Sequence, residues 1–280
     1  MGRAMDTEAT KGVGVQLAEL VVEARVFDLG HPLETTMPVS PNHPGYRMAL
    51  LRRHGDMVRA DGGSAANEMI VMGGHTGTHF DALSHVSHQG KLHGGIDAAT
   101  VQTDGSRFSQ LGVETVDPIV CRGVLLDVAG ARGVEALPEG EAITAEDLAT
   151  VAEQEGVVIG AGDAVLVRSG WARYWGDPPR YIGHDSGVPG PDEGAARWLA
   201  DHDIRVTGHD SMAYEHLPAG SGHRLLPVHR VLLVESGIFI IENVDMEALS
   251  ATGVHEFLFM VSPLPFVGGT GSPVRPVAVI

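Results

Sequence analysis

A histidine-rich tract between positions 75 and 93 holds the residues of this chain that are best suited to chemistry. Its first part, His75-Thr-Gly-Thr-His79-Phe-Asp81-Ala-Leu-Ser-His85, brings three histidines and one carboxylate into eleven residues. Imidazole nitrogen and carboxylate oxygen are ligands of zinc and the later first-row metals, whereas calcium and magnesium prefer oxygen alone. Glycine and threonine between His75 and His79 favour a turn that points both imidazoles and Asp81 at one position. We therefore predict a metal site formed by His75, His79 and Asp81.

The surroundings of the tract bear on what kind of site this is. No cysteine takes part, which disfavours a closed structural zinc site and favours one that leaves a coordination position to water or substrate. Histidine-rich surface tracts can also bind metal without catalytic use, and five of the fifteen histidines lie between positions 75 and 93. An apolar run at residues 69–72 precedes the tract and has the character of a strand, which favours a site built into the fold.

The tract resembles the motif of the cyclase family of metal-dependent hydrolases, which includes bacterial kynurenine formamidase and isatin hydrolase. That motif runs H-x-G-T-H-x-D-A with a further histidine three residues on, and residues 75–85 match each element, although Leu83 stands where proline is common. Family-like segments also begin at Phe27, Gly162 and Gly268, so the resemblance spans about residues 26–280. It implies that His75, His79 and Asp81 bind metal and that His85 acts as an acid or base.

The resemblance also implies a second half-site near the C-terminus, where a histidine and a glutamate of the family correspond to His229 and Glu242. Their spacing is about one residue longer than in compact formamidases. If residues 225–234 are helical, His229 points inward together with the neighbouring leucines, Leu225, Leu226, Leu232 and Leu233. If residues 238–242 form a strand, alternation of its side chains places Glu242 on the same buried face as Ile238 and Ile240. A carboxylate there must be paired, protonated or bound to metal. The alternatives are a core histidine and a salt bridge to Arg224 or Arg230.

These residues lead us to predict a metal-dependent hydrolase that cleaves an amide, formamide or cyclic amide bond of a small molecule with a metal-activated water. His85 would transfer the proton, and Glu242 would bind a metal or, with a single metal, orient the water. The expected cofactor is Zn²⁺ or Mn²⁺, one or two per subunit, with Asp81 as a possible bridge. The alternatives are a lactone hydrolase or dehydrating cyclase, or a non-catalytic metal-dependent binding protein. A serine hydrolase is disfavoured because the chain lacks a G-x-S-x-G elbow.

Aromatic residues are the candidates for substrate contact. Phe80 lies between two predicted ligands and is expected at the wall of the site, and Trp171, with Tyr174 and Trp175, could line a pocket for a flat substrate. The alternative for all of them is ordinary packing. His209 has no role that the sequence assigns.

Composition limits the partners. The chain has 19 basic and 36 acidic residues and a net charge of −17, which disfavours binding to nucleic acid or to an anionic membrane surface. It has no apolar run of roughly the 20 residues that a membrane span needs, and no secretory signal pattern follows Met1, so we expect a cytoplasmic protein. The resemblance implies a homodimer or homotetramer, for which residues 15–22 and 37–39 could supply contacts.

No repeat or linker divides the chain, so we predict one domain at residues 14–280 after a mobile stretch at 1–13. Thr144 followed by Asp147 predicts a helix start, and a second helix is expected to begin near Pro191. These segments make the fold α/β, and the resemblance implies the swivelling β/β/α type with a mixed sheet core. Short apolar runs predict strands at residues 26–29, 69–72, 124–128, 164–167, 204–207, 238–241, 257–261 and 274–280.

Overall fold

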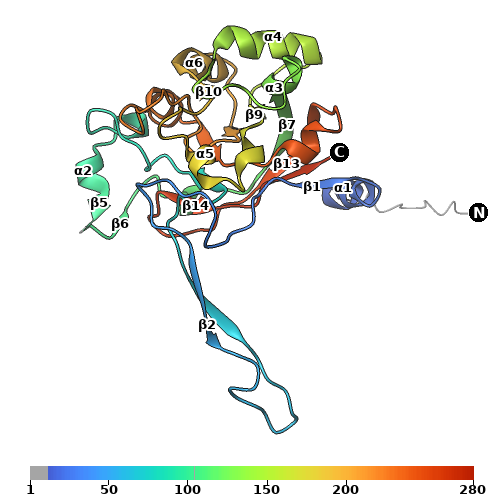
Figure 1. Ribbon diagram of the computed structural model, residues 1–280, viewed down its shortest axis with the longest axis vertical. Coiled ribbons are helices and arrows are strands. Elements are labelled where there is room, and N and C mark those ends of the chain that lie inside the picture. Colours follow the sequence, from blue (N-terminus) through green and yellow to red (C-terminus); the bar gives the residue numbers. More distant parts are fainter. Residues whose placement is uncertain (1–11, 104) are drawn as a thin grey trace, which may run out of the picture.

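A curled nine-stranded mixed sheet runs through the body of the protein (Figure 1). The computed structural model describes residues 12–103 and 105–280, so the predicted mobile stretch lies almost wholly outside the described residues. The strands of this sheet, in spatial order, are β1 (Val26–Asp28), β15 (Val277–Val279), β13 (Glu256–Val261), β7 (Ile119–Asp127), β9 (Ala164–Arg168), β11 (Val206–His209), β12 (Phe239–Glu242), β4 (His79–Asp81) and β14 (Gly271–Pro273).

The four central strands β7, β9, β11 and β12 are parallel, and antiparallel strands flank them on both sides. Seven of the eight predicted strands overlap strands of this sheet. The exception is residues 69–72, which overlap β3 (Asn67–Val71) in a separate hairpin. β4 and β14 were not predicted, because three residues are too few to show an alternating pattern.

Alternate residues of the central strands face two separate hydrophobic layers. On β7, Val124 and Leu126 point to a layer shared with helices, while Leu125 points to the opposite layer. The helix-covered layer includes α4 (Ala145–Glu155) and α6 (Glu193–Asp201), which lie above the sheet in Figure 1. The parallel strands are therefore apolar on both faces, as strands in the middle of an α/β sheet must be.

The two predicted long helices are present. Thr144 and Asp147 form the reciprocal capping box of α4, and Gly156 ends this helix in the left-handed conformation. α6 begins two residues later than expected, at Glu193, because Pro191 lies in β10 and Asp192 is the residue that caps the helix. The α/β class with a mixed sheet in one domain is confirmed.

The predicted helix at 225–234 has different bounds and a different form. It begins at Pro227, so Leu225 lies before it and is 81% exposed rather than inward. After α7 (Pro227–His229) the chain continues as a π-helix, η4 (Arg230–Ser236). A π-helical turn accommodates one extra residue in a helix, which can absorb the longer spacing between His229 and Glu242.

No helix in the described part of the chain combines the length and apolar character that a membrane crossing requires.

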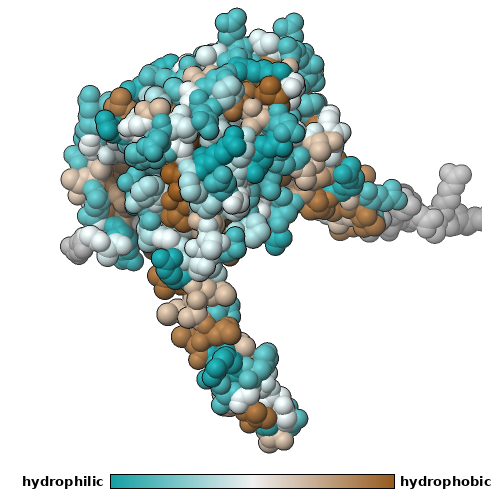
Figure 2. All heavy atoms as spheres, in the orientation of Figure 1, coloured by the Kyte–Doolittle hydropathy of each residue, from teal (hydrophilic) through white to brown (hydrophobic). Residues whose placement is uncertain are grey.

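The remaining elements are short. Two parts of this set, α1 and the β2–β3 hairpin, extend away from the body of the molecule (Figure 1, Figure 2). The short elements are α1 (Val13–Val21), β2 (Arg47–Arg52), β3, η1 (His93–Gly95), α2 (Ala98–Val101), β5 (Gln102–Thr103), β6 (Arg107–Phe108), η2 (Val113–Thr115), α3 (Val128–Ala131), β8 (Ala142–Ile143), η3 (Trp171–Tyr174), α5 (Pro178–Ile182), β10 (Gly190–Pro191) and α8 (Glu247–Ser250).

Candidate metal centre

The sheet itself brings the two halves of the predicted site together. β12 pairs with β4 in antiparallel register, and Glu242 lies directly opposite His79. The turn before β4 is tight, as predicted. Gly77 has a φ of +71°, a left-handed conformation that favours glycine, and a Cβ there would also force the end of the Leu33 side chain to shift. Two residues 163 positions apart in the chain are thus neighbours across one strand pair.

All five predicted metal ligands converge. His79 Nε2 lies 3.6 Å from Asp81 Oδ1 and 3.3 Å from Glu242 Oε2. His229 Nε2 lies 3.1 Å from Glu242 Oε1 and 3.7 Å from Asp81 Oδ2. His75 Nδ1 lies 2.7 Å from Asp81 Oδ1. The cluster thus contains residues of β4, β12 and α7 and of the turn that precedes β4.

The chemistry of this cluster fits a divalent cation. Asp81 is fully buried, and its Oδ2 has no hydrogen-bond partner, which is costly for a carboxylate oxygen unless a cation neutralises it. Donor atoms of His75, His79 and Asp81 all lie within 4.8 Å of one another. Glu242 pairs with two histidines, and Arg230 pairs with Glu193 and Glu235 instead, so the predicted alternative of an Arg230–Glu242 salt bridge is wrong.

Outer hydrogen bonds fix the orientation of the imidazoles. His79 Nδ1 donates to the carbonyl of Gly77 at 2.8 Å, which leaves Nε2 for the cluster. His229 Nδ1 lies 2.7 Å from Glu215 Oε1. Such partners set the tautomer and raise the basicity of a ligand imidazole. The sequence analysis did not assign Glu215 a role.

Replacing Glu215 by glutamine should therefore weaken metal binding by roughly 10–100-fold, the usual effect of losing an outer partner of a ligand histidine. Glu215 is 1% exposed and also accepts hydrogen bonds from the backbone amides of Val228 at Oε2 and of His229 at Oε1, of which glutamine, with a single carbonyl oxygen, can retain one. Competition with a chromophoric chelator measures the change. Glu193→Gln is the matched control, because Glu193 binds the neighbouring Arg230 and should leave affinity unchanged. Equal affinities for all three proteins would contradict the role of Glu215.

The metal-free cluster holds protons. Burial alone would lower the pKa of His79, but the hydrogen bond and charge of Glu242, together with the charge of Asp81, raise it to about 9. Burial alone would also lower the pKa of His229, but the nearby carboxylate of Asp81 and the hydrogen bonds with Glu215 and Glu242 raise it well above its ordinary value. Burial raises the pKa of Glu242, yet its contacts with His229 and His79 bring it down to about 2. The histidines are charged and the carboxylate is ionised near neutral pH.

Metal affinity should consequently rise with pH between about 6 and 9, because each protonated imidazole must lose its proton to bind metal. Two such protons would give up to about 100-fold per pH unit. In the metal-free protein the raised pKa of His79 stabilises the fold below the ordinary histidine pKa, and this contribution is lost as pH rises through about 9. Titration of metal affinity at several pH values tests the first statement. An affinity that does not change with pH would show that the rings carry no such protons.

His85 lies beside the cluster. Its ring stacks on His75 with centroids 3.8 Å apart and lies 6.2 Å from the ring of His229. Burial lowers the pKa of His85 to about 3, so in the metal-free protein the ring is neutral near pH 7 and is a weaker base than an ordinary histidine. Donor atoms of Asp81, His85 and His229 also lie within 4.8 Å of one another.

The predicted substrate contacts are not at the site. Phe80 is on β4 between His79 and Asp81, so it points to the opposite face, where it is fully buried and packs against Phe239. Trp171 is also fully buried, and its indole nitrogen donates to the carbonyl of Tyr181. Both substrate-binding predictions are wrong, and the alternative of ordinary packing holds for these two residues.

The other singled-out residues lie around the centre rather than in it. His88 is exposed, and His93 bonds to the carbonyl of Val234. His209 is fully buried on β11, where its Nδ1 lies 2.8 Å from Ser211 Oγ. A further histidine, His43, has its ring centroid 5.4 Å from that of His75, and no motif in the sequence pointed to it.

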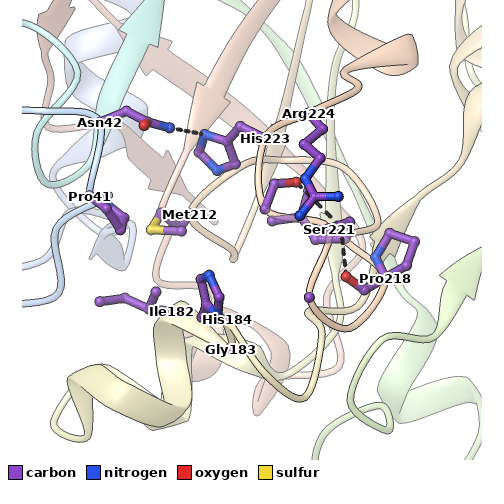
Figure 3. A pocket seen from close by; sticks show the side chains of 13 residues that line it. Pro41, Asn42, Ile182, Gly183, His184, Met212, Pro218, Ser221, His223 and Arg224 are labelled. Carbon is purple, nitrogen blue, oxygen red and sulfur yellow. Dashed lines mark hydrogen bonds between the residues drawn. The ribbon is translucent and has the colours of Figure 1, made fainter.

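The residues labelled in Figure 3 line a cavity of about 360 Å³. His223 is the member of this lining that senses the metal centre, because burial lowers its pKa while the charge of Glu242 raises it and that of His229 lowers it. Its Nδ1 lies 3.1 Å from the amide nitrogen of Asn42 on the opposite wall. Apolar side chains of Pro41, Ile182, Met212 and Leu217 form much of the rest. No pattern in the sequence indicates this cavity, because residues 41–42, 182–184 and 212–224, which are far apart in the chain, line it together.

Comparison with known proteins agrees with this geometry. A family model described as a putative cyclase matches residues 27–216. Isatin hydrolase of Roseibium aggregatum is 27% identical over 224 residues, which cover 79% of this chain and 77% of that protein. Cyclase-like protein 2 of Oryza sativa subsp. japonica is 28% identical over 90% of this chain and 78% of its own length.

Solved structures share the fold. The crystal structure of a novel cyclase superposes with a TM-score of 0.84 at 28% identity, covering 95% of this chain and 92% of that one. Isatin hydrolase A from Ralstonia solanacearum gives a TM-score of 0.75 at 22% identity and covers 98% and 99% of the two chains. The family match spans more than half of the chain, and the protein therefore belongs to the cyclase family, as its sequence motif indicated.

Proposed function

We propose that this protein is a metal-dependent hydrolase that cleaves the carbon–nitrogen bond of a small amide, formamide or cyclic amide. The observation that carries the proposal is the convergence of His75, His79, Asp81, His229 and Glu242 beside a cavity of small-molecule size. The relation to an isatin hydrolase supports the bond type, because isatin is a cyclic amide.

The donor set favours Zn²⁺ or Mn²⁺ over Ca²⁺ or Mg²⁺, because three imidazoles accompany two carboxylates. A divalent ion held there would lower the pKa of a water from about 15.7 to about 7 and would polarise a carbonyl group. Asp81 offers Oδ1 toward His75 and His79 and Oδ2 toward His229, and Glu242 likewise offers Oε2 toward His79 and Oε1 toward His229, so either carboxylate would be able to bridge two ions.

His85 would move the proton. Its ring is neutral near pH 7 and would take a proton from the attacking water. The lowered pKa makes the ring a weak base, but once protonated it would be a strong acid toward the departing nitrogen. Stacking on His75 holds the ring at a fixed distance from the cluster. On the cavity side, Asn42 and His223 would position the polar part of the substrate, and Met212 and Leu217 would contact its apolar part.

The test is to remove metal with a strong chelator and restore Zn²⁺ or Mn²⁺ in a screen of aryl formamides, lactams and lactones. We expect no turnover without metal and restored turnover of an amide-type substrate with it. Full activity of the metal-free protein would refute the mechanism. Turnover of lactones alone would favour the lactone hydrolase alternative. Saturable binding of these compounds without turnover would favour the binding-protein alternative.

A further inference from the structure

One ring nitrogen of His223 has no partner in the protein. Nε2 of this ring is buried, and it forms no hydrogen bond with any residue that the structure describes. The other nitrogen, Nδ1, lies 3.1 Å from the side-chain amide nitrogen of Asn42 (Figure 3). Buried polar atoms nearly always have a hydrogen-bond partner, so Nε2 is suited to a partner that binds from outside the chain.

The contact with Asn42 determines which nitrogen of His223 carries the proton. The amide nitrogen of Asn42 can only donate, so Nδ1 of the ring must accept and has no proton of its own. Burial lowers the pKa of His223, so the ring is neutral near pH 7 and has a single N–H group. That group is therefore at Nε2, where it is a buried donor that no acceptor in the described part of the chain satisfies.

The carboxylates that act on this ring are already paired. The charges of Glu242 and Glu215 both raise the pKa of His223, so the ring lies within electrostatic range of the metal centre. Each oxygen of these two carboxylates lies against an imidazole of the metal centre or accepts from a backbone amide. The Nε2–H group is thus left for an acceptor that arrives with a ligand.

Two short turns hold the hydrogen-bonded pair in place. The amide of His43 donates to the carbonyl of Ser40 at 3.0 Å and closes the turn that carries Asn42. In the other segment, the amide and the hydroxyl of Ser221 both donate to the carbonyl of Pro218, at 3.0 and 2.6 Å. A donor that is fixed before the substrate arrives stabilises developing charge without the cost of reorganisation.

The role that we assign to His223 rests on the proposed function. Attack of water on an amide places negative charge on the carbonyl oxygen, and a fixed donor beside that oxygen stabilises the charge. His223 lines the cavity and has such a donor. We propose that His223 is a catalytic residue that donates a hydrogen bond from Nε2 to the carbonyl oxygen of the substrate, and that Asn42 is the positioning residue that fixes its tautomer.

Substitution of His223 tests the catalytic part of this proposal, with the substrate that the screen of amides identifies. His223→Leu removes the donor and should lower kcat by roughly 10²–10³-fold, the usual cost of losing one such donor, without loss of bound metal. His223→Gln places an amide N–H near the position of Nε2 and should recover part of the loss. His202→Leu is the matched control, because His202 also uses Nδ1 in a hydrogen bond, to the carbonyl of Trp198, but lies outside the cavity. It should leave kcat unchanged.

Nitrogen-15 NMR of the metal-free protein tests the tautomer without any substrate. Two-bond proton–nitrogen correlations of labelled histidines distinguish a ring protonated at Nε2 from one protonated at Nδ1, and the spectrum of His223→Leu identifies the signals of His223. We expect the Nε2–H form in the wild-type protein and a mixture of both forms in Asn42→Leu. That variant should also lose kcat, by a smaller factor than His223→Leu.

Three results would overturn the assignment of His223 while leaving the proposed function intact. They are an Nδ1–H ring in the wild-type protein, a wild-type kcat in His223→Leu, and a loss of metal in His223→Leu that parallels the loss of activity. The last result would make the ring a structural support rather than a donor. Absence of amide turnover by the metal-loaded wild-type protein would instead refute the proposed function, and the role of His223 with it.

Discussion

Asp81→Asn should cost the protein both its metal and its activity. Asp81 lies between three histidines, at 2.7 Å from His75, 3.6 Å from His79 and 3.7 Å from His229, and no other carboxylate among residues 12–103 and 105–280 touches all three. Loss of an outer partner alone weakens a metal site by roughly 10–100-fold, so loss of this central charged donor should exceed about 100-fold in affinity. Metal content after dialysis and turnover with excess metal measure the two effects.

The control for this variant is Asp163→Asn. Asp163 is also a buried carboxylate, 6% exposed, but it pairs with Arg122 outside the cluster. We expect Asp163→Asn to bind metal as the wild-type protein does, even if it unfolds at a lower temperature. If Asp81→Asn retains a full complement of tightly bound metal, the metal lies elsewhere and the proposed centre is wrong.

His85→Ala should have the opposite signature, with metal retained and catalysis lost. General acid–base groups contribute about 10²–10⁴-fold to rate, so kcat should fall by that amount. The neutral ring of His85 stacks on His75 without bonding to it, so its removal leaves the hydrogen bonds of His75 to Asp81 and Thr270 intact. Metal analysis together with kcat at saturating substrate distinguishes proton transfer from ligation.

His88→Ala is the matched control, because His88 belongs to the same tract but is exposed and should change neither property. A parallel loss of metal and activity in His85→Ala would make His85 a ligand. The distances allow this outcome, since donor atoms of Asp81, His85 and His229 fall within 4.8 Å of one another.

The first half of the site could be predicted because it is local. Three donors within seven residues can reach one ion whatever the rest of the fold does, and Gly77 marks the turn that brings them together. His229 and Glu242 required two further arguments, an inward helix face and a buried strand face. Both placed the side chains correctly, although the helix begins at Pro227 and continues as a π-helix.

Other parts of the site depend on contacts that leave no local pattern. Glu215 acts through His229, and only the folded chain places their side chains 2.7 Å apart. Phe80 was misplaced for a different reason. Residues 79–81 form a strand rather than part of the turn. Side chains alternate along a strand, so when His79 and Asp81 face the metal centre, Phe80 must face the opposite side of the sheet. The cavity is made of loops, whose course the residue pattern does not encode.

The β2–β3 hairpin shows what an apolar pattern alone cannot decide. The prediction of a strand at residues 69–72 is confirmed, because they overlap β3. The apolar pattern does not reveal that β3 lies in a separate hairpin and that each of its residues is exposed.

The most direct test of the metal centre is a crystal structure of the protein with Zn²⁺ or Mn²⁺, with the ion located by anomalous diffraction. We expect an ion bound by His75, His79 and Asp81, with His229 Nε2 or a Glu242 oxygen at about 2.0–2.2 Å from an ion in the same cluster. An ordered ion whose shell is completed by water, with His229 and Glu242 both more than about 6 Å away, would contradict the account, because that distance is well beyond direct ligation.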